Sequence, residues 1–162
     1  MSYFAFLEEH GVTLLLGSVT TIKVLICSII LYVIISMIFG LMRISKNKVV
    51  QGIATGYIEF FRGTSLLVQL FWFYYVLPFF GLSLEAFWAG VISLGMNFGA
   101  YGAEIVRAGI LAVPKGQWEA AHALNFSPAK RIKNIIIPQI FPIILPPAAN
   151  LTVELLKATA LV

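Results

Sequence analysis

Long apolar runs separated by short charged segments dominate the 162-residue chain. A helix that crosses the ~30 Å hydrocarbon core of a bilayer needs ~20 largely apolar residues, because it rises ~1.5 Å per residue. Unpaired backbone groups are costly in lipid, so each run of this length is expected to be helical. The pattern therefore predicts four membrane-spanning helices, at residues 12–40, 62–80, 85–106 and 136–162.

The composition agrees with a membrane protein. Hydrophobic residues make up 60% of the chain and charged residues 11%, whereas a soluble domain carries roughly 25% charged residues. So few polar side chains would not cover a water-facing surface. We therefore expect an all-α, polytopic transmembrane bundle that forms one domain over residues 1–162, with membrane lipid around it.

The charges between the apolar runs predict an orientation. Lys and Arg gather after the first and third runs, in segments 41–50 and 107–133, whereas the other side shows only Glu8, Glu9 and Glu85. Because Lys and Arg mark the cytosolic side, we expect the N-terminus outside and both basic segments inside. The residues before the first run lack the basic start of a signal peptide, so this run is expected to remain as an anchor.

The last apolar run continues to Val162 without a polar tail. A helix that ended there would have neither a cap nor an interfacial anchor. We therefore expect this sequence to be truncated, with a later part missing.

Segment 107–133 is predicted to form a helix–turn–helix elbow. The run Val113-Pro114-Lys115-Gly116 is typical of a turn, and residues 117–124 favour a short helix. Asn125 tolerates the left-handed conformation that ends a helix, and Ser127-Pro128 is typical of the start of a second one. On these features alone, an amphipathic loop lying on the lipid headgroups is an equal alternative.

Several motifs in this order resemble a known family. The run Gln117-Trp118-Glu119-Ala120-Ala121-His122-Ala123-Leu124, followed by Ile137-Pro138-Gln139, resembles the EAA loop of ABC-importer permeases. Segments 61–70, 103–110 and 155–162 are similar to the polar amino acid permease branch, which has the MetI-like fold. Segments 97–110 and 157–162 are most similar to ectoine/hydroxyectoine permease subunits.

The resemblance implies five spans in a bacterial plasma membrane, of which four are present here. It implies that the elbow docks on a separate cytosolic ATPase, and that a second permease subunit completes the pore. An extracytoplasmic solute-binding protein would deliver polar amino acids or related solutes. The residues that the resemblance assigns to the ATPase contact are Gly116, Glu119, Ala120, Ala121, Leu124, Asn125 and Pro138. Asn125 replaces the family's usual Gly, and we expect the turn to survive, since Asn tolerates positive φ.

Acidic and basic residues recur three positions apart, which places opposite charges on one helix face. The pairs are Glu59/Arg62, Glu104/Arg107 and Glu154/Lys157. The first two flank spans and are predicted to be interfacial anchors. The third lies deeper in the last run. It is expected to face either the bundle interior or a water path. Because the resemblance implies charged or zwitterionic substrates, this pair, with Asn150, is a candidate for the substrate path, and anchoring is the alternative.

Proline and glycine patterns leave two questions open. Pro138, Pro142 and Pro146 fall four residues apart on one face, and each removes a backbone donor. The helix is predicted to be kinked or broken, either to line a transport path or to pack. Gly95 and Gly99 allow close helix approach, either between two permeases or within this chain.

The sequence lacks the motifs of ATPases, of metal-binding proteins and of nucleic-acid-binding proteins. No G-x-x-x-x-G-K-[ST] loop is present, so the chain is not expected to hydrolyse ATP itself. Cys27 is the single cysteine and both histidines stand alone, so no metal or cofactor is expected. The basic residues form no stripe with aromatics, which argues against nucleic acid. A membrane-embedded enzyme and a self-sufficient channel are the alternatives to an ATPase-driven permease, and the elbow favours the permease.

Overall fold

The computed structural model describes residues 3–162 and contains no strand in that range. Its main helices are α1 (Tyr3–Arg43), α2 (Lys48–Gly63), α4 (Ala86–Leu111) and α7 (Ile137–Ala158). Between α2 and α4 lie α3 (Leu66–Phe71), a π turn (Trp72–Val76) and a 3₁₀ turn (Leu77–Phe80). Between α4 and α7 lie α5 (Lys115–Ala123), α6 (Pro128–Arg131) and a π turn (Ile132–Ile136), and a 3₁₀ turn (Thr159–Leu161) follows α7. The predicted all-α class is confirmed.

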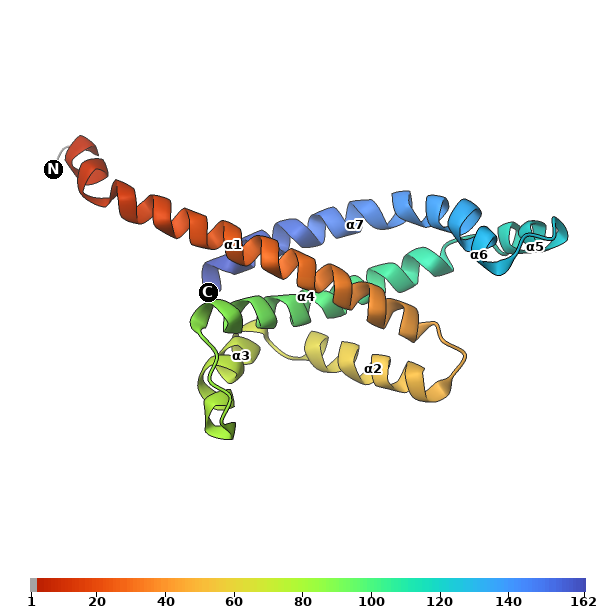
Figure 1. The fold of residues 1–162 in the computed structure, drawn as a ribbon, viewed down its shortest axis with the longest axis horizontal. Helices are drawn as coiled ribbons and strands as arrows, with labels where there is room; N and C mark the ends of the chain where they lie inside the picture. The colour runs from red at the N-terminus through yellow and green to blue at the C-terminus, as the bar shows by residue number, and fades with distance from the viewer. Residues whose placement is uncertain (1–2) are drawn as a thin grey trace.

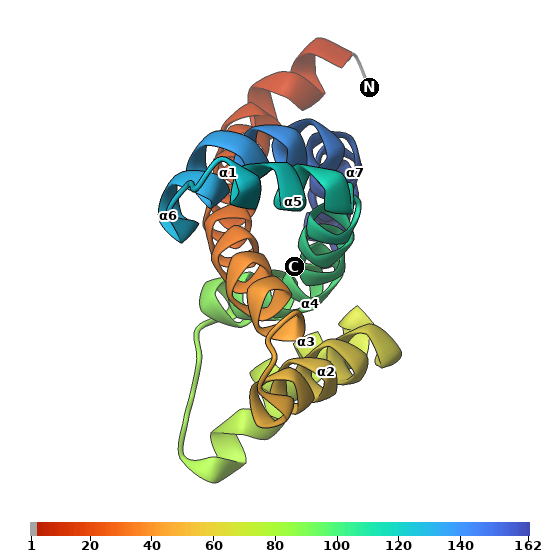
Figure 2. The same cartoon turned by 90° about the vertical axis from the view of Figure 1, so that its right-hand side faces the viewer.

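Helices α1 and α4 form the centre of the molecule (Figures 1 and 2). Glycines of α4 make their close approach possible, because a Cβ at Gly95 would overlap Leu31 and one at Gly99 would overlap Ile35. The hydroxyl of Ser36 donates to the Gly99 carbonyl across this contact, at 3.2 Å. The Gly95/Gly99 pattern therefore serves helix packing within this chain.

Two helices are long and apolar enough to cross a bilayer, Val12–Arg43 and Ala129–Leu161. A third crossing results if α2 and Leu66–Phe80 count as one span, bent by 101°. The structure thus gives two or three candidate spans where four were predicted. Helix α4 is not among these candidates; it contains several glycines and Asn97, and much of it is buried against other helices.

The helix predicted at 62–80 is present, but it begins later, at Leu66, and continues to Phe80 through the π and 3₁₀ turns. Helix α2 already begins at Lys48, where the side chain of Asn47 accepts the Val49 N–H at 2.9 Å as an N-cap. It ends at Gly63, and the chain then turns into α3, which projects away from the bundle (Figure 1). Helix α2 is amphipathic, and a search for continuous apolar runs overlooks such a helix.

Buried amides hold the bend between α2 and α3. The Gln69 amide donates to the Thr64 hydroxyl at 2.6 Å and to the Phe61 carbonyl at 3.0 Å. Asn97 of α4 donates to the same Phe61 carbonyl at 3.0 Å and to the Gln69 side chain at 3.2 Å. These bonds satisfy a carbonyl near the end of α2, and irregular backbone at membrane depth requires such partners.

Of the kink or break predicted for this segment, the break is not observed, because α7 stays continuous through Pro142, Pro146 and Pro147. The irregular backbone lies just before it, in the π turn Ile132–Ile136. Pro138 in the first turn of α7 has no N–H to donate, and the wider turn accommodates it there. Helix α4 also runs past its predicted end at 106, to Leu111.

The two basic segments lie at the same end of the molecule, at the right in Figure 1, where α1 leads into α2 and where α5 and α6 follow α4. The start of α1 and the link at 81–85 lie toward the other end. This arrangement agrees with the expectation that both basic segments lie on the same side of the membrane. The side chains of Glu8 and Glu9 lie outside the described part of the chain.

Candidate functional site

Helices α5 and α6 form the predicted elbow, and local signals fix its turns. The Phe126 N–H donates to the Ala121 carbonyl at 3.3 Å and the Asn125 N–H to the His122 carbonyl at 3.0 Å, which is a Schellman turn. Asn125 has a φ of 52°, so the predicted left-handed residue is confirmed. Helix α6 begins at Pro128, as the sequence predicts.

The elbow residues do not all face outward. Glu119, Ala120 and Leu124 are exposed, whereas Ala121 is 1% exposed and packs within its own chain. Neighbouring residues point about 100° apart around a helix, so Ala120 can be exposed while Ala121 is buried. In this chain Ala120 is accessible to a partner and Ala121 packs inside, while the contact of either residue with an ATPase stays a prediction.

Gly116 has a different place from the one predicted. It lies in the first turn of α5, which begins after Pro114, and among the described glycines only Gly81 has a positive φ. A Cβ at Gly116 would meet nothing within 4 Å in this chain. Gly116 is thus not needed to redirect the backbone. Because it has no side chain, the backbone of α5 is accessible at this position.

Polar contacts tie the elbow to α7. The Gln139 amide donates to the Gln117 side chain of α5 at 3.3 Å and to the Ile135 carbonyl at 2.9 Å. Pro138, the neighbour of Gln139, is exposed at the start of α7. The Arg131 guanidinium donates to the Phe126 carbonyl at 3.3 Å. The hydrogen bond between Gln117 and Gln139 thus joins α5 to the start of α7.

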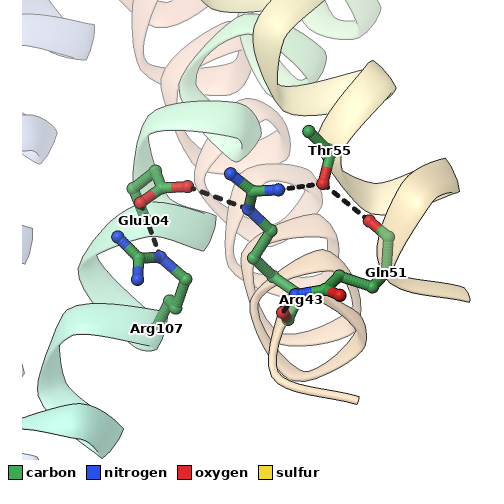
Figure 3. Close-up of polar contacts among 5 residues, drawn as sticks. All are labelled: Arg43, Gln51, Thr55, Glu104 and Arg107. Atoms are coloured by element: carbon green, nitrogen blue, oxygen red, sulfur yellow. Dashed lines mark hydrogen bonds and ion pairs between the residues drawn. The ribbon is translucent and has the colours of Figure 1, made fainter. Parts of the chain in front are cut away.

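A charged cluster joins α1, α2 and α4 (Figure 3). Glu104 accepts from Arg107 Nε at 2.8 Å and lies 3.6 Å from Arg43 Nε. Arg43 also donates to the Thr55 hydroxyl, which in turn donates to the Gln51 carbonyl at 2.7 Å. The predicted Glu104/Arg107 pair is confirmed, and Arg43 extends it to three helices.

The other two charge pairs are not formed in the described part of the chain, where the ion pairs are those of Glu104. Arg62 lies instead over the Tyr101 ring, with its guanidinium carbon 5.2 Å from the ring centroid. Glu154 and Lys157 are both exposed on α7. Exposed pairs gain little from contact, so the spacing alone does not enforce them.

A partly polar groove of about 490 Å³ lies between α2, α4 and α7. Its lining residues are Arg62 of α2, Tyr101, Glu104, Ile105 and Ala108 of α4, and Ile143, Pro147, Asn150, Leu151 and Glu154 of α7. Two of the predicted substrate-path residues, Asn150 and Glu154, therefore share one groove, and Lys157 lies outside it. Arg62 and Tyr101 were missed, because only packing brings them to α7.

The groove offers groups for both ends of a zwitterion. Arg62 provides a cation, and Glu154 a carboxylate without an ion-pair partner in the described residues. Pro147 has no N–H, so the Ile143 carbonyl lacks its usual intrahelical donor and remains an acceptor. Asn150 can both donate and accept. In the described residues no group of His, Cys, Asp and Glu is arranged to hold a metal ion.

Known proteins resemble the chain over most of its length. Residues 32–162 match the family described as binding-protein-dependent transport system inner membrane component. The chain is 45% identical over 152 residues to the probable amino-acid ABC transporter permease protein y4tF of Sinorhizobium fredii, covering 90% of this chain and 64% of that protein. It is 41% identical over 145 residues to the L-cystine transport system permease protein TcyB of Bacillus subtilis, covering 90% and 62%.

The chain thus spans less than two thirds of the length of these two relatives. The fold also matches a solved structure, the crystal structure of an amino acid ABC transporter with histidines. The TM-score is 0.85 at 38% sequence identity, and the match covers 99% of this chain and 74% of that one.

Proposed function

Because the chain belongs to the family of binding-protein-dependent transport system inner membrane components, we propose that it is the permease subunit of an ABC importer for amino acids. Its relatives carry the names of amino-acid and L-cystine permeases, which supports amino acids over ectoine-type solutes. It acts as a transport subunit and not as an enzyme. A solute-binding protein outside the cell and a second permease subunit complete the assembly.

The observation that carries this proposal is the elbow. Glu119, Ala120 and Leu124 are exposed on it, and Gln117 ties it to Gln139 of α7. An ATPase that docks on this face moves α5, and the contact with Gln139 passes the motion to a helix that lines the polar groove. Ala121 and Asn125 contribute by holding the elbow in shape.

We place four spans in the membrane: α1, the bent pair formed by α2 and Leu66–Phe80, α4, and α7. The N-terminus lies outside, since the basic segments gather at the elbow end. Helix α4 is shielded from lipid by its neighbours, so its glycines and Asn97 are tolerated at membrane depth.

The groove between α2, α4 and α7 is the proposed substrate path. The carboxylate of the amino acid pairs with Arg62, and its ammonium group with Glu154 and the free Ile143 carbonyl. Asn150 completes the polar contacts. Lys157 lies one turn beyond Glu154 and acts at the entrance to the path rather than within it.

Charge reversal on the elbow tests this function. We expect Glu119→Lys to weaken co-purification of the cognate ATPase by tenfold or more, because unfavourable charge contacts at an interface cost several kcal/mol. Amino acid uptake by cells should fall with it. Glu119 is exposed, so folding of the permease should be unaffected.

The matched control is Glu85→Lys, an exposed glutamate just before α4, whose other end leads to the elbow. It should leave both the ATPase association and the uptake unchanged. Normal association and uptake in Glu119→Lys would refute docking through this face.

A further inference from the structure

Two glutamates line the polar groove, and their surroundings differ. Glu154 of α7 has no ion-pair partner in the described residues, whereas Glu104 of α4 faces one arginine with each of its two oxygens. Arg107 Nε lies 2.8 Å from one oxygen and Arg43 Nε lies 3.6 Å from the other (Figure 3). One carboxylate of the groove is therefore open to a substrate, and the other is already occupied.

The two arginines leave a surplus of positive charge beside Glu104. Two guanidinium groups face one carboxylate, and within the described range neither arginine forms an ion pair with a second one. The side chain of Glu104 is 19% exposed and that of Arg43 is 24% exposed. Charges that are mostly buried are weakly screened by salt, so a further cation is repelled at this point of the groove.

Glu104 lies within reach of the side chain of an amino acid in the groove. Arg62 lies over the ring of Tyr101, which precedes Glu104 by three residues on α4. Three residues of helix rise ~4.5 Å and turn the chain back to within ~60° of the same face. A side chain with two methylene groups spans about 4 Å, since each C–C bond is ~1.5 Å long. An amino acid whose carboxylate pairs with Arg62 can therefore extend its side chain along α4 to Glu104.

We propose that the cluster of Arg43, Glu104 and Arg107 sets the charge selectivity of the substrate path. The ammonium group of the amino acid engages Glu154, and the two arginines engage Glu104, so neither glutamate is left for a cationic side chain. The groove therefore takes amino acids with neutral or acidic side chains and discriminates against lysine and arginine. The inference rests on the proposed function, which makes this groove the substrate path.

Direct binding measures the selectivity of the groove itself. The full permease is purified with its ATPase and the second permease subunit, without the solute-binding protein, whose own preference would otherwise contribute. Binding of radiolabelled L-glutamine, L-glutamate and L-lysine is measured by equilibrium dialysis. We expect the Kd of L-lysine to exceed that of L-glutamine about tenfold, because its side-chain ammonium finds no free carboxylate. L-Glutamate should bind at least as tightly as L-glutamine.

Substitutions of opposite sign should move the selectivity in opposite directions. Arg107→Gln frees one oxygen of Glu104, so L-lysine should gain about tenfold relative to L-glutamine. Glu104→Gln leaves the two arginines without their carboxylate, so L-glutamate should gain relative to L-glutamine by about the same factor. Arg107→Lys retains the cation and should restore the discrimination that Arg107→Gln loses. The ratio of two Kd values does not depend on the yield of folded protein.

The matched control is Lys48→Gln at the start of α2. Lys48 follows Arg43 by five residues, is exposed and lies outside the groove. Its replacement removes the same charge from the same end of the molecule, so the three Kd values should stay unchanged. If Arg107→Gln does not fold, Arg43→Gln makes the same comparison, with a smaller gain for L-lysine because Arg43 lies farther from Glu104.

An unchanged ratio in Arg107→Gln, with L-glutamine still bound, would overturn the inference and leave the permease function standing. A cluster that only ties α1 to α4 gives this result. Tighter binding of L-lysine than of L-glutamine by the original chain would also overturn it. Failure to bind any of the three amino acids would remove the groove as the substrate path, and the inference with it. Docking of the ATPase is tested separately, through Glu119→Lys.

Discussion

The glutamates Glu104 and Glu154 differ in the ion-pair partners that neighbouring helices provide. Glu104 is held by two arginines from different helices, whereas Glu154 has no such partner in the described residues and lies in the polar groove. Both occur at the same three-residue spacing from a basic residue. The spacing therefore does not distinguish a structural ion pair from a carboxylate that is available to a substrate.

The two charges of the last run should differ in their effect on transport. We expect Glu154→Gln to raise the KM of amino acid uptake about tenfold, because a hydrogen bond to a charged group contributes ~1.5–3 kcal/mol. Lys157→Met should have a smaller effect, since Lys157 lies outside the groove. Uptake of a radiolabelled amino acid and the yield of assembled permease are measured together. Normal transport by the double variant would remove both residues from the substrate path.

At the scale of elements, local signals predicted the elbow well. Pro114 before α5, Asn125 after it and Pro128 at the start of α6 act through the backbone of their own neighbourhood. Helix α2 was missed because its polar face interrupts every apolar run. The sequence predicted a kink or a break in α7, whereas the helix is continuous and the irregular backbone is the π turn just before it.

Substitution of Asn125 tests the turn of the elbow. We expect Asn125→Gly to be neutral, because Gly adopts positive φ without strain. Asn125→Val should cost ~1–2 kcal/mol, since a branched side chain is strained in this conformation. Limited proteolysis should then cut the elbow faster, and substrate-stimulated ATP hydrolysis by the assembled transporter should fall. A valine variant as resistant and as active as the original would show that the turn tolerates any residue.

At the scale of the whole molecule, glycines set how the helices meet. Gly95 and Gly99 let α4 approach α1, and the buried amides of Gln69 and Asn97 hold the end of α2, where Arg62 lies, against α4. This packing creates the polar groove between α2, α4 and α7.

Cysteine labelling tests how the molecule crosses the membrane. In a Cys27→Ser background, Ser83→Cys should react with a membrane-impermeant maleimide in intact cells, because the link at 81–85 is expected outside. Ala123→Cys on the elbow should react only after permeabilisation. Both positions are exposed, so access to the reagent depends on sidedness. The reverse labelling pattern would mean that the orientation is inverted.

The amino-acid sequence by itself determined the membrane class, the helical fold and the turns of the elbow. Composition is a property of the whole chain, and helix-end signals act over a few residues. Both can therefore be recognised without knowing which helices are neighbours. It also placed Asn150 and Glu154 on the same stretch of α7. The tertiary structure alone decided that Arg62 and Tyr101 join them, that Ala121 is buried and that α2 bends into α3. These features depend on which helix faces meet, and contacts between residues distant in sequence leave no local pattern.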